Sequence, residues 1–291
     1  MTPQQYCIDK TNESGSSFLP AFHFLGKEKK MALTALYAFC REVDDAVDEC
    51  KEYKEGKAKL DWWSLELSRL FSGTPRHPVT KTLINYIDKF DLNKEYFDEI
   101  IDGMEMDLNF NRYENFKQLQ LYCYRVASSV GILSAKIFGF NDTKTLKYAH
   151  DMGIALQLTN IIRDLGEDAR RGRIYAPLDE LKIFGVTEAD VLNHIEGEKI
   201  KKLVVFLSER AENFYFSAIS HLPIEDKRKQ LPGLMMGNIY FVLLEEIIKN
   251  NPEKILNQRT MLTPFRKIAV ALTCFMNYTW IKRERKAPNL L

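Results

Sequence analysis

The sequence predicts an all-α protein, a single domain spanning residues 1–291 with helices packed around a central cavity. Apolar residues recur at the spacing of amphipathic helices along nearly the whole chain, and no stretch shows the alternation typical of a strand. The segments between these patterns are short, and no linker rich in Pro, Gly or Ser divides the chain. With 291 residues, the chain is long enough to bury a sizeable core.

The expected helices come in close succession along the chain. The segment 28–50 is the clearest, because apolar residues keep helical spacing from Leu33 to Val47. A short helix is expected before it, near the N-terminus. The other expected helices span 58–72, 79–90, 94–110, 116–139, 142–168, 187–195, 198–221, 226–250 and 262–283. The pair Pro232-Gly233 is expected to kink the helix that contains it.

Composition and charge exclude several classes of protein. Hydrophobic residues make up 45% of the chain and charged residues 28%, which are ordinary values for a globular protein. A net charge of +1 gives no electrostatic argument for nucleic acid as a partner. Charges interrupt each apolar run before the roughly 20 residues that a membrane span requires, and the N-terminus has no signal-peptide core. The five cysteines lack CxxC spacing, so reduced thiols and a cytoplasmic location are expected.

One stretch carries a row of polar residues on an otherwise apolar helix. In QLTNIIRDLGED (157–168), the polar residues Gln157, Asn160, Asp164 and Asp168 are three or four positions apart. Residues at this spacing are neighbours on one face of a helix. The apolar residues between them leave other faces of the helix for packing.

A second stretch repeats the arrangement. In YAFCREVDDAVDE (37–49), Arg41 precedes Asp44 and Asp48, and the two aspartates again stand four residues apart. Like charges at this spacing destabilise an isolated helix by roughly 0.2–0.5 kcal/mol per pair. Two such pairs therefore suggest a cation between two helices. Carboxylate oxygens without Cys or His partners suit Mg²⁺, with Mn²⁺ as the alternative.

The long apolar segment 116–139 is unusual in its small residues, which include Ala127 and Gly131. Such residues would let a partner helix or a long apolar ligand approach the backbone closely. Tyr122 precedes Val130 by just over two turns, so both are expected on one face of a continuous helix.

Together these segments resemble the squalene/phytoene synthase family of head-to-head prenyl transferases, and most of all its bacterial presqualene diphosphate synthases. The segments that carry the resemblance are SGSSF (14–18), YAFCREVDDAVDE (37–49), YCYRVASSVG (122–131) and QLTNIIRDLGEDARRGRIYAP (157–177). Two DxxxD motifs with a tyrosine motif between them are highly specific to this family. The resemblance implies the isoprenoid-synthase fold, Mg²⁺, and two allylic prenyl diphosphates as substrates.

The resemblance also implies roles for individual residues. The implied metal ligands are Asp44, Asp48, Asp164 and Asp168, with Asp45 and Asn160 as additional ligands. The residues implied to bind diphosphate are Arg41, Arg163, Arg259, Ser14, Ser16 and Ser17. The implied polar positions of the site are Tyr37, Tyr122, Gln157, Asn160 and Tyr240, with Tyr122 assisting a proton transfer. The implied apolar tunnel is lined by Phe18, Phe22, Ala127, Val130, Gly131 and Leu156. Ser128 replaces a glycine of many members, which puts the width of this tunnel in question.

The function expected from the resemblance is condensation of two farnesyl diphosphates to presqualene diphosphate, or onward to squalene. The alternatives are a phytoene or dehydrosqualene synthase, a prenyl diphosphatase in which water captures the cation, and a non-catalytic assembly factor. NADPH is not expected to be required. The basic stretch KRERK (282–286) suggests peripheral contact with the inner face of a membrane, or with downstream isoprenoid enzymes.

Overall fold

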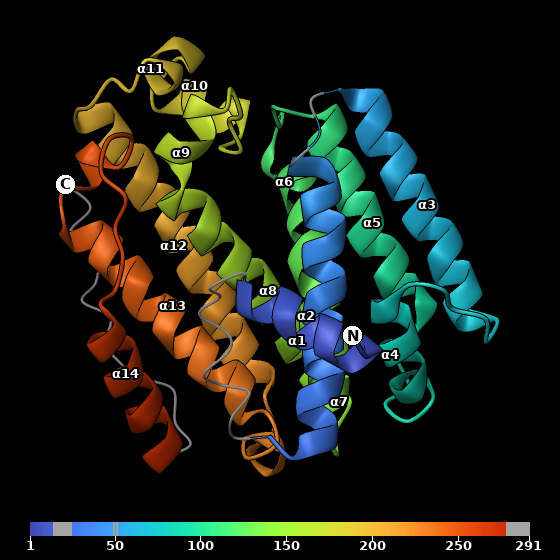
Figure 1. Cartoon of the computed structure of the whole chain (residues 1–291). Coiled ribbons are helices and arrows are strands. Elements are labelled where there is room, and N and C mark those ends of the chain that lie inside the picture. Colours follow the sequence, from blue (N-terminus) through green and yellow to red (C-terminus); the bar gives the residue numbers. More distant parts are fainter. Residues whose placement is uncertain (14–24, 49, 51, 278–291) are drawn as a thin grey trace.

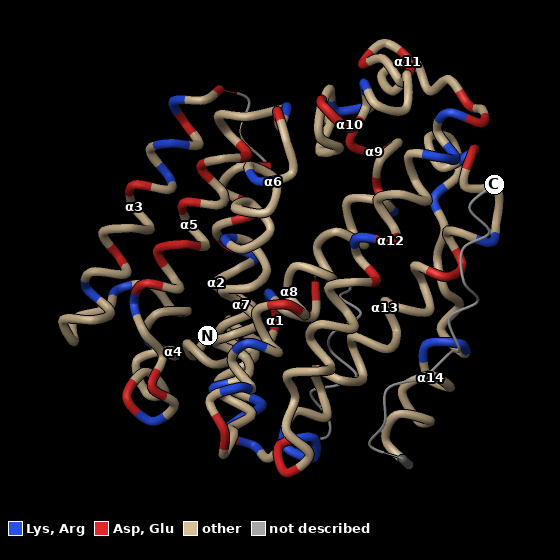
Figure 2. Tube along the Cα trace, turned by 180° about the vertical axis from the view of Figure 1, so that it is seen from behind, with Lys and Arg blue, Asp and Glu red and all other residues tan. Residues whose placement is uncertain are grey.

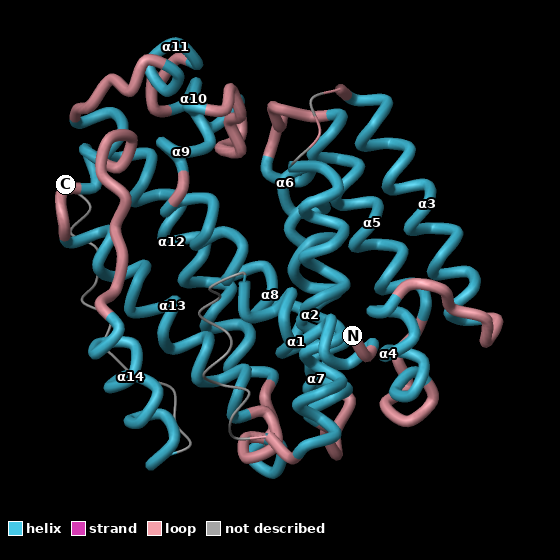
Figure 3. Tube along the Cα trace, viewed as in Figure 1, coloured by secondary structure: helices cyan, strands magenta, loops and turns pink. Residues whose placement is uncertain are grey.

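The computed structural model describes residues 1–13, 25–48, 50 and 52–277. In this part of the chain all regular structure is helical, and the only β-type pairing is one bridge between Arg112 and Ile174 (Figure 3). The prediction of an all-α fold is therefore confirmed. The first helices are α1 (Pro3–Glu13), α2 (Lys27–Asp48), α3 (Tyr53–Phe71), α4 (Pro78–Ile87), α5 (Lys94–Asn109), α6 (Phe116–Cys123), a π-helical turn (Tyr124–Ser128) and α7 (Ser129–Phe138). The remaining helices are α8 (Lys144–Arg163), α9 (Leu165–Arg170), α10 (Leu178–Ile183), α11 (Glu188–Leu192), α12 (Glu198–His221), α13 (Leu231–Lys249) and α14 (Pro264–Asn277), with 3₁₀ turns at Ile224–Asp226 and Pro252–Lys254.

The helices form two groups that each bury an apolar core. Helices α2 to α5 stand on one side of the molecule, and α8, α12, α13 and α14 stand on the other (Figure 1). One cluster of buried side chains, which includes Phe39, Leu67 and Phe97, belongs to the first group. The other, which includes Leu158 and Tyr215, belongs to the second. The rows of polar residues on α2 and α8 therefore lie where the two groups of helices meet.

Helix α8 is the centre of the fold, and it packs on α12, α13, α7 and the π-helical turn. Small residues allow this contact. A methyl group at Gly153 would lie 2.5 Å from the Cα of Ser128, and one at Gly131 would lie 2.8 Å from the carbonyl oxygen of Ala149. The buried Ser128 hydroxyl donates a hydrogen bond of 2.7 Å to the carbonyl of His150. Ser128 therefore sits in a helix contact and does not narrow a tunnel.

Two expected helices are interrupted. The segment 142–168 is divided into α8 and α9 at Asp164, whose backbone leaves the helical region with φ −99° and ψ 9°. The segment 116–139 contains the π-helical turn, which holds more residues per turn than an α-helix and so shifts the register of α7 relative to α6. Neither break has a proline, so the helical pattern contained no sign of it.

The expected kink at Pro232-Gly233 is wrong. Both residues lie in the first turn of α13, where the missing N–H of proline has no helical partner in any case. The short helix α10 was not expected, because its six residues are too few to show a helical period.

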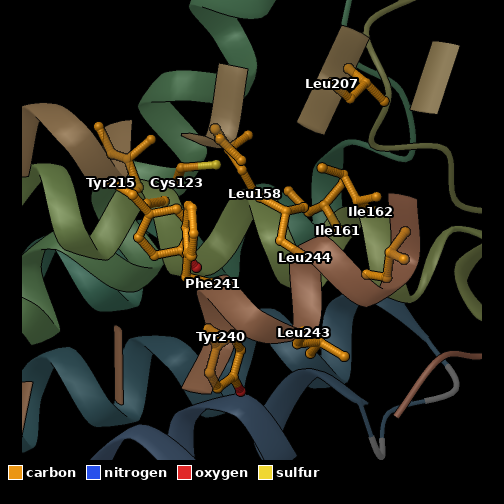
Figure 4. Packing of buried hydrophobic residues seen from close by; sticks show 14 of the residues in the cluster. Cys123, Leu158, Ile161, Ile162, Leu207, Tyr215, Tyr240, Phe241, Leu243 and Leu244 are labelled. Carbon is orange, nitrogen blue, oxygen red and sulfur yellow. The ribbon is translucent and has the colours of Figure 1, made fainter. Parts of the chain in front are cut away.

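Helix α13 is long and apolar enough to cross a membrane by composition alone, yet 78% of its most apolar window is buried inside the protein. Figure 4 shows Phe241 and Leu244 packed toward Leu158 and Tyr215, while Tyr240 lies on the opposite side of the helix. An apolar helix covered in this way is the core helix of a globular fold.

Candidate active site

A pocket of about 730 Å³ lies between the two groups of helices, and both DxxxD motifs line it. Helix α2 contributes Asp44 and Asp48, and the α8–α9 junction contributes Asp164 and Asp168. Beside this pocket lies an apolar cavity of about 270 Å³. Three residues belong to the walls of both spaces, namely Tyr37, Gln157 and Asn160. A charged pocket and an apolar cavity therefore share one boundary.

The aspartates of the first motif do not all point toward the pocket. Arg41 donates to Asp44 and to Asp45, each at 2.5 Å. Asp45 also pairs with Lys10 at 2.9 Å and lines a separate surface hollow. Consecutive residues of a helix point about 100° apart, since a turn holds 3.6 residues. The structure therefore brings Asp44 and Asp48 to the pocket but does not bring Asp45.

The second motif is held by arginines. Arg163 Nε donates to Asp164 Oδ1 at 2.8 Å, and Arg259 Nε donates to the same oxygen at 2.8 Å. Arg259 also pairs with Glu167 at 3.3 Å. The structure thus brings Arg259, far along the chain, to the motif it was expected to serve. Two permanently charged forks beside one carboxylate also offer donors suited to diphosphate oxygens.

Two aspartates of the DxxxD motifs, Asp44 and Asp168, have raised pKa values. Burial and, to a smaller extent, the charge of Asp164 raise the pKa of Asp168 to about 7, against the opposing effect of Arg173. Burial also raises the pKa of Asp44 to about 6, with Arg41 opposing and Asp48 contributing. A divalent cation would relieve both effects, because it favours the charged form of each carboxyl.

The donors present fit Mg²⁺ bound together with phosphate. Among the described residues, no three His, Cys, Asp or Glu side chains already stand close enough to hold an ion. Mg²⁺ is commonly held by one or two carboxylates, with waters and substrate phosphates completing its shell. Asn160 Oδ1 is buried, has no hydrogen-bond partner in the described chain, and belongs to a residue that lines the pocket. This orphaned oxygen is a further acceptor for a cation or its water.

Several pocket residues were not predicted from the sequence. The polar and charged ones are Asp107, Arg171, Arg173, Tyr175 and Lys267. Arg171 and Arg173 approach Asp48 at 3.7 and 3.5 Å. The segment GRIYAP is part of a stretch that carries the family resemblance, so Arg173 and Tyr175 could have been predicted from that resemblance. Asp107 was one of several acids on an amphipathic helix, and its position depends on tertiary packing.

Tyr122 occupies a different place from the one expected. Its hydroxyl donates to Asp107 at 2.9 Å, and the Tyr175 hydroxyl donates to the other carboxylate oxygen at 2.7 Å. Burial raises the pKa of Asp107 to about 6 and holds that of Tyr122 well above its ordinary value. Tyr122 lines the polar pocket, whereas Val130 lines the apolar cavity. The π-helical turn between them changes the register, so they do not share a face.

The remaining predicted residues fall into three groups. Gln157, Asn160, Arg163 and Tyr240 line the pocket, as do Tyr37 and Arg41. Ala127, Val130, Gly131 and Leu156 line the apolar cavity. Ser14, Ser16, Ser17, Phe18 and Phe22 lie outside the described residues.

Comparison with known families decides the class of protein. A profile of the squalene/phytoene synthase family matches residues 11–266. The chain belongs to this family. The phytoene synthase of Arthrospira platensis is 35% identical over 277 residues, which cover 91% of this chain and 89% of the relative. The 15-cis-phytoene synthase of Synechococcus elongatus is 32% identical and covers 90% of this chain and 89% of the relative.

Solved structures agree with this membership. A dehydrosqualene synthase superposes with a TM-score of 0.85 at 28% identity, covering 94% of this chain and 95% of that one. Squalene synthase HpnC from Alicyclobacillus acidocaldarius gives 0.78 at 25% identity, covering 86% and 94%. Family members are prenyltransferases, and this chain is an enzyme of that type. The relatives favour the phytoene or dehydrosqualene synthase alternative over a presqualene diphosphate synthase.

Without a cation, the stability of the protein should depend on pH. Folding raises the pKa of Asp168 to about 7 and that of Asp44 to about 6, from an ordinary value of 3.8. At a pH between the ordinary pKa and the raised pKa of each carboxyl, the folded protein holds a proton that the unfolded chain has released. Stability therefore falls as the pH rises from about 4 to about 7. Thermal unfolding in the presence of a chelator measures this.

Mg²⁺ competes with those protons, so the increase in Tm that it produces should grow over the same pH range. Asp168→Asn keeps the shape of the side chain and removes one titrating group. In the presence of a chelator, the Tm of this variant should depend less on pH than that of the wild type. Mg²⁺ should also raise its Tm by a smaller amount. An increase in Tm of equal size at about pH 5 and about pH 8 would contradict the assignment of these carboxyls as ligands.

Because the hydroxyls of Tyr122 and Tyr175 both donate to Asp107, we expect Asp107→Asn to slow turnover. An amide has one acceptor oxygen where the carboxylate has two, so one of the two tyrosine hydroxyls loses its partner. We expect kcat to fall about ten- to hundredfold, the effect of one hydrogen bond to a charged group, with little change in KM.

A double-mutant cycle with Tyr122→Phe supplies the decisive comparison. Tyr122→Phe should lower kcat much less in the Asp107→Asn background than in the wild type, because both changes break the same contact. Glu105→Gln, on the same helix but outside the pocket, is the control and should keep wild-type kcat. Fully additive losses would show that Asp107 does not act through Tyr122.

Proposed function

We propose that this enzyme condenses two geranylgeranyl diphosphates head to head, as a phytoene synthase. The observation that carries the proposal is the shared boundary between the carboxylate and arginine pocket and the apolar cavity. A prenyl diphosphate has a charged head and an apolar chain, so one molecule would span this boundary. The curated relatives named phytoene synthase, at 35% and 32% identity, support the choice of a C20 chain.

The first step that this site would support is loss of diphosphate from one substrate. The allylic C–O bond breaks, the electron pair leaves with diphosphate, and a carbocation remains. Arg41, Arg163 and Arg259 would hold the leaving group, since their charges already converge on the aspartates. Asp44, Asp48, Asp164 and Asp168 would hold Mg²⁺, which when bound neutralises developing charge on diphosphate oxygens.

The second substrate would then add to the cation through its 2,3 double bond. Loss of a proton closes a cyclopropane, and departure of the second diphosphate is followed by loss of another proton to give a polyene. These steps consume no reductant, so NADPH is not needed for a phytoene-type product. Tyr122, paired with Asp107, is our candidate to orient the proton transfer. The apolar cavity would keep water from the cation.

A farnesyl-specific enzyme that makes dehydrosqualene is the second candidate. The superposition on a dehydrosqualene synthase, with a TM-score of 0.85, supports it. Both candidates share the site and differ only in the length of chain that the cavity accepts. We place either activity in the cytoplasm, which the five free thiols support.

Product analysis tests the proposal. Purified enzyme with Mg²⁺ and geranylgeranyl diphosphate, without NADPH, should yield a C40 polyene and two diphosphates per product. With farnesyl diphosphate alone, turnover to a C30 polyene should be slower. Faster C30 formation would favour the dehydrosqualene synthase, and C20 alcohol as the sole product would overturn the condensation proposal.

Chain length should depend on Phe138, which lies in the wall of the apolar cavity. Phe138 lines both this cavity and a separate surface pocket of about 510 Å³ beside Lys29. Phe138→Ala joins the two spaces, so a C25 diphosphate should gain on the C20 substrate. We expect the ratio of their kcat/KM values to rise at least about tenfold, within the usual effect of opening an apolar pocket.

Leu133→Ala is the matched control, because Leu133 is also buried on α7 but does not line the cavity. Both variants should lose stability, by roughly 2–5 kcal/mol, as large-to-small changes in a core do. Only Phe138→Ala should change the preference for chain length. The same ratio in both variants would remove Phe138 from this role.

A further inference from the structure

Helix α1 brings a lysine to the first aspartate motif. Tyr6 and Lys10 lie one turn apart on α1, and they meet Glu42 and Asp45, which lie about one turn apart on α2. The Tyr6 hydroxyl donates to Glu42 at 2.7 Å. Lys10 Nζ lies 2.9 Å from Asp45 Oδ2 and 3.3 Å from Glu42 Oε1. These contacts fix α1 across α2, where Figure 1 shows it.

Asp45 connects Lys10 with an arginine of the active-site pocket. Its Oδ2 pairs with Lys10, and its Oδ1 accepts from Nη2 of Arg41. Nη1 of the same guanidinium donates to Asp44, and both Arg41 and Asp44 line the pocket. Lys10 and Asp45 line the separate surface hollow instead. A row of four alternating charges therefore runs from this hollow to the pocket.

Lys10 affects how Arg41 can bind to Asp45. A guanidinium and a carboxylate favour a forked contact, in which two parallel N–H groups donate to the two oxygens. Lys10 competes for Oδ2, and Arg41 contacts Asp45 through one nitrogen and Asp44 through another. Without Lys10, both oxygens of Asp45 would be open to the fork. The guanidinium would then turn from Asp44 toward Asp45, and so away from the pocket.

We propose that Lys10 is a positioning residue for Arg41. By pairing with Asp45, it keeps the guanidinium divided between Asp44 and Asp45 and facing the pocket. The inference rests on the proposed function, in which Arg41 holds diphosphate. A guanidinium has five N–H donors, and the two carboxylates engage one nitrogen each, so donors remain for diphosphate oxygens. The packing of α1 thereby contributes to diphosphate affinity, although α1 does not line the pocket.

Calorimetric titration of the full-length protein with inorganic pyrophosphate and Mg²⁺ tests this role without turnover. Lys10→Met keeps most of the length of the side chain and removes its charge. We expect the Kd for pyrophosphate to rise about three- to tenfold, the usual effect of one hydrogen bond.

Lys57→Met is the matched control. Lys57 also pairs with two carboxylates, Asp61 at 3.0 Å and Glu105 at 2.8 Å, and thereby joins α3 to α5. Helix α3 carries acidic and basic residues along its whole length (Figure 2), and none of these three residues lines the pocket. This variant should keep the Kd of the wild type. Equal Kd values for Lys10→Met and Lys57→Met would overturn the proposal.

The double variant Lys10→Met/Asp45→Asn distinguishes positioning from general support of the fold. An asparagine has one acceptor oxygen and cannot accept the fork. The double variant should therefore bind pyrophosphate more tightly than Lys10→Met alone. If Lys10 only stabilised the packing of α1, a second substitution at the same contact would restore nothing. A double variant that binds as weakly as Lys10→Met would overturn the proposal.

Arg41→Gln separates this inference from the proposed function. If Arg41→Gln weakens pyrophosphate binding and Lys10→Met does not, the positioning role is overturned and the proposed function stands. If Arg41→Gln binds pyrophosphate as the wild type does, Arg41 does not hold diphosphate. That result would overturn the positioning role together with the part of the proposed function that assigns the leaving group to Arg41.

Discussion

Burial of closely spaced carboxylates is the constraint on which the site depends. Packing of the two helical groups places Asp44 and Asp48 of α2 opposite Asp164 and Asp168 of the α8–α9 junction, on the wall of one pocket. Burial raises the pKa of Asp168 to about 7, so the arrangement costs free energy that a folded core must supply. Arginines offset part of this cost. A cation and a diphosphate would offset the rest, which is why the pocket suits an ionised leaving group.

The separation of charge from apolar surface results from the same packing. Helix α8 presents Gln157 and Asn160 to both spaces, while its small residues let α7 and the π-helical turn approach. The two spaces meet at those amides and at Tyr37. A carbocation formed at the boundary would have charge on one side and a water-poor cavity on the other, which is the environment that condensation requires.

Periodicity predicted the helices and spacing predicted the two carboxylate pairs, whereas the arginines of the pocket and the residues of the apolar cavity were predicted from the resemblance to the family. The helices could be predicted because burial of one face imposes a period of 3.6 residues on the apolar positions. The DxxxD pairs could be recognised because like charges four residues apart destabilise a helix unless a cation binds them. The break at Asp164 and the π-helical turn were not predicted, since nothing local forbids a continuous helix there. Asp107 was missed for a related reason: its partners Tyr122 and Tyr175 come from other elements. Asp45 was misplaced because its pairing with Lys10 depends on how α1 packs.

We propose that the two carboxylate pairs hold a cation together with diphosphate. Anomalous diffraction from crystals grown with Mn²⁺ and an unreactive thiolo-diphosphate analogue tests it most directly. We expect anomalous peaks between the analogue and the carboxylates of Asp44, Asp48, Asp164 and Asp168, at ligand distances of about 2.0–2.2 Å. A peak assigned to Asp168 should weaken in Asp168→Asn crystals. A bound analogue with no anomalous peak near either pair would show that these carboxylates do not hold a cation.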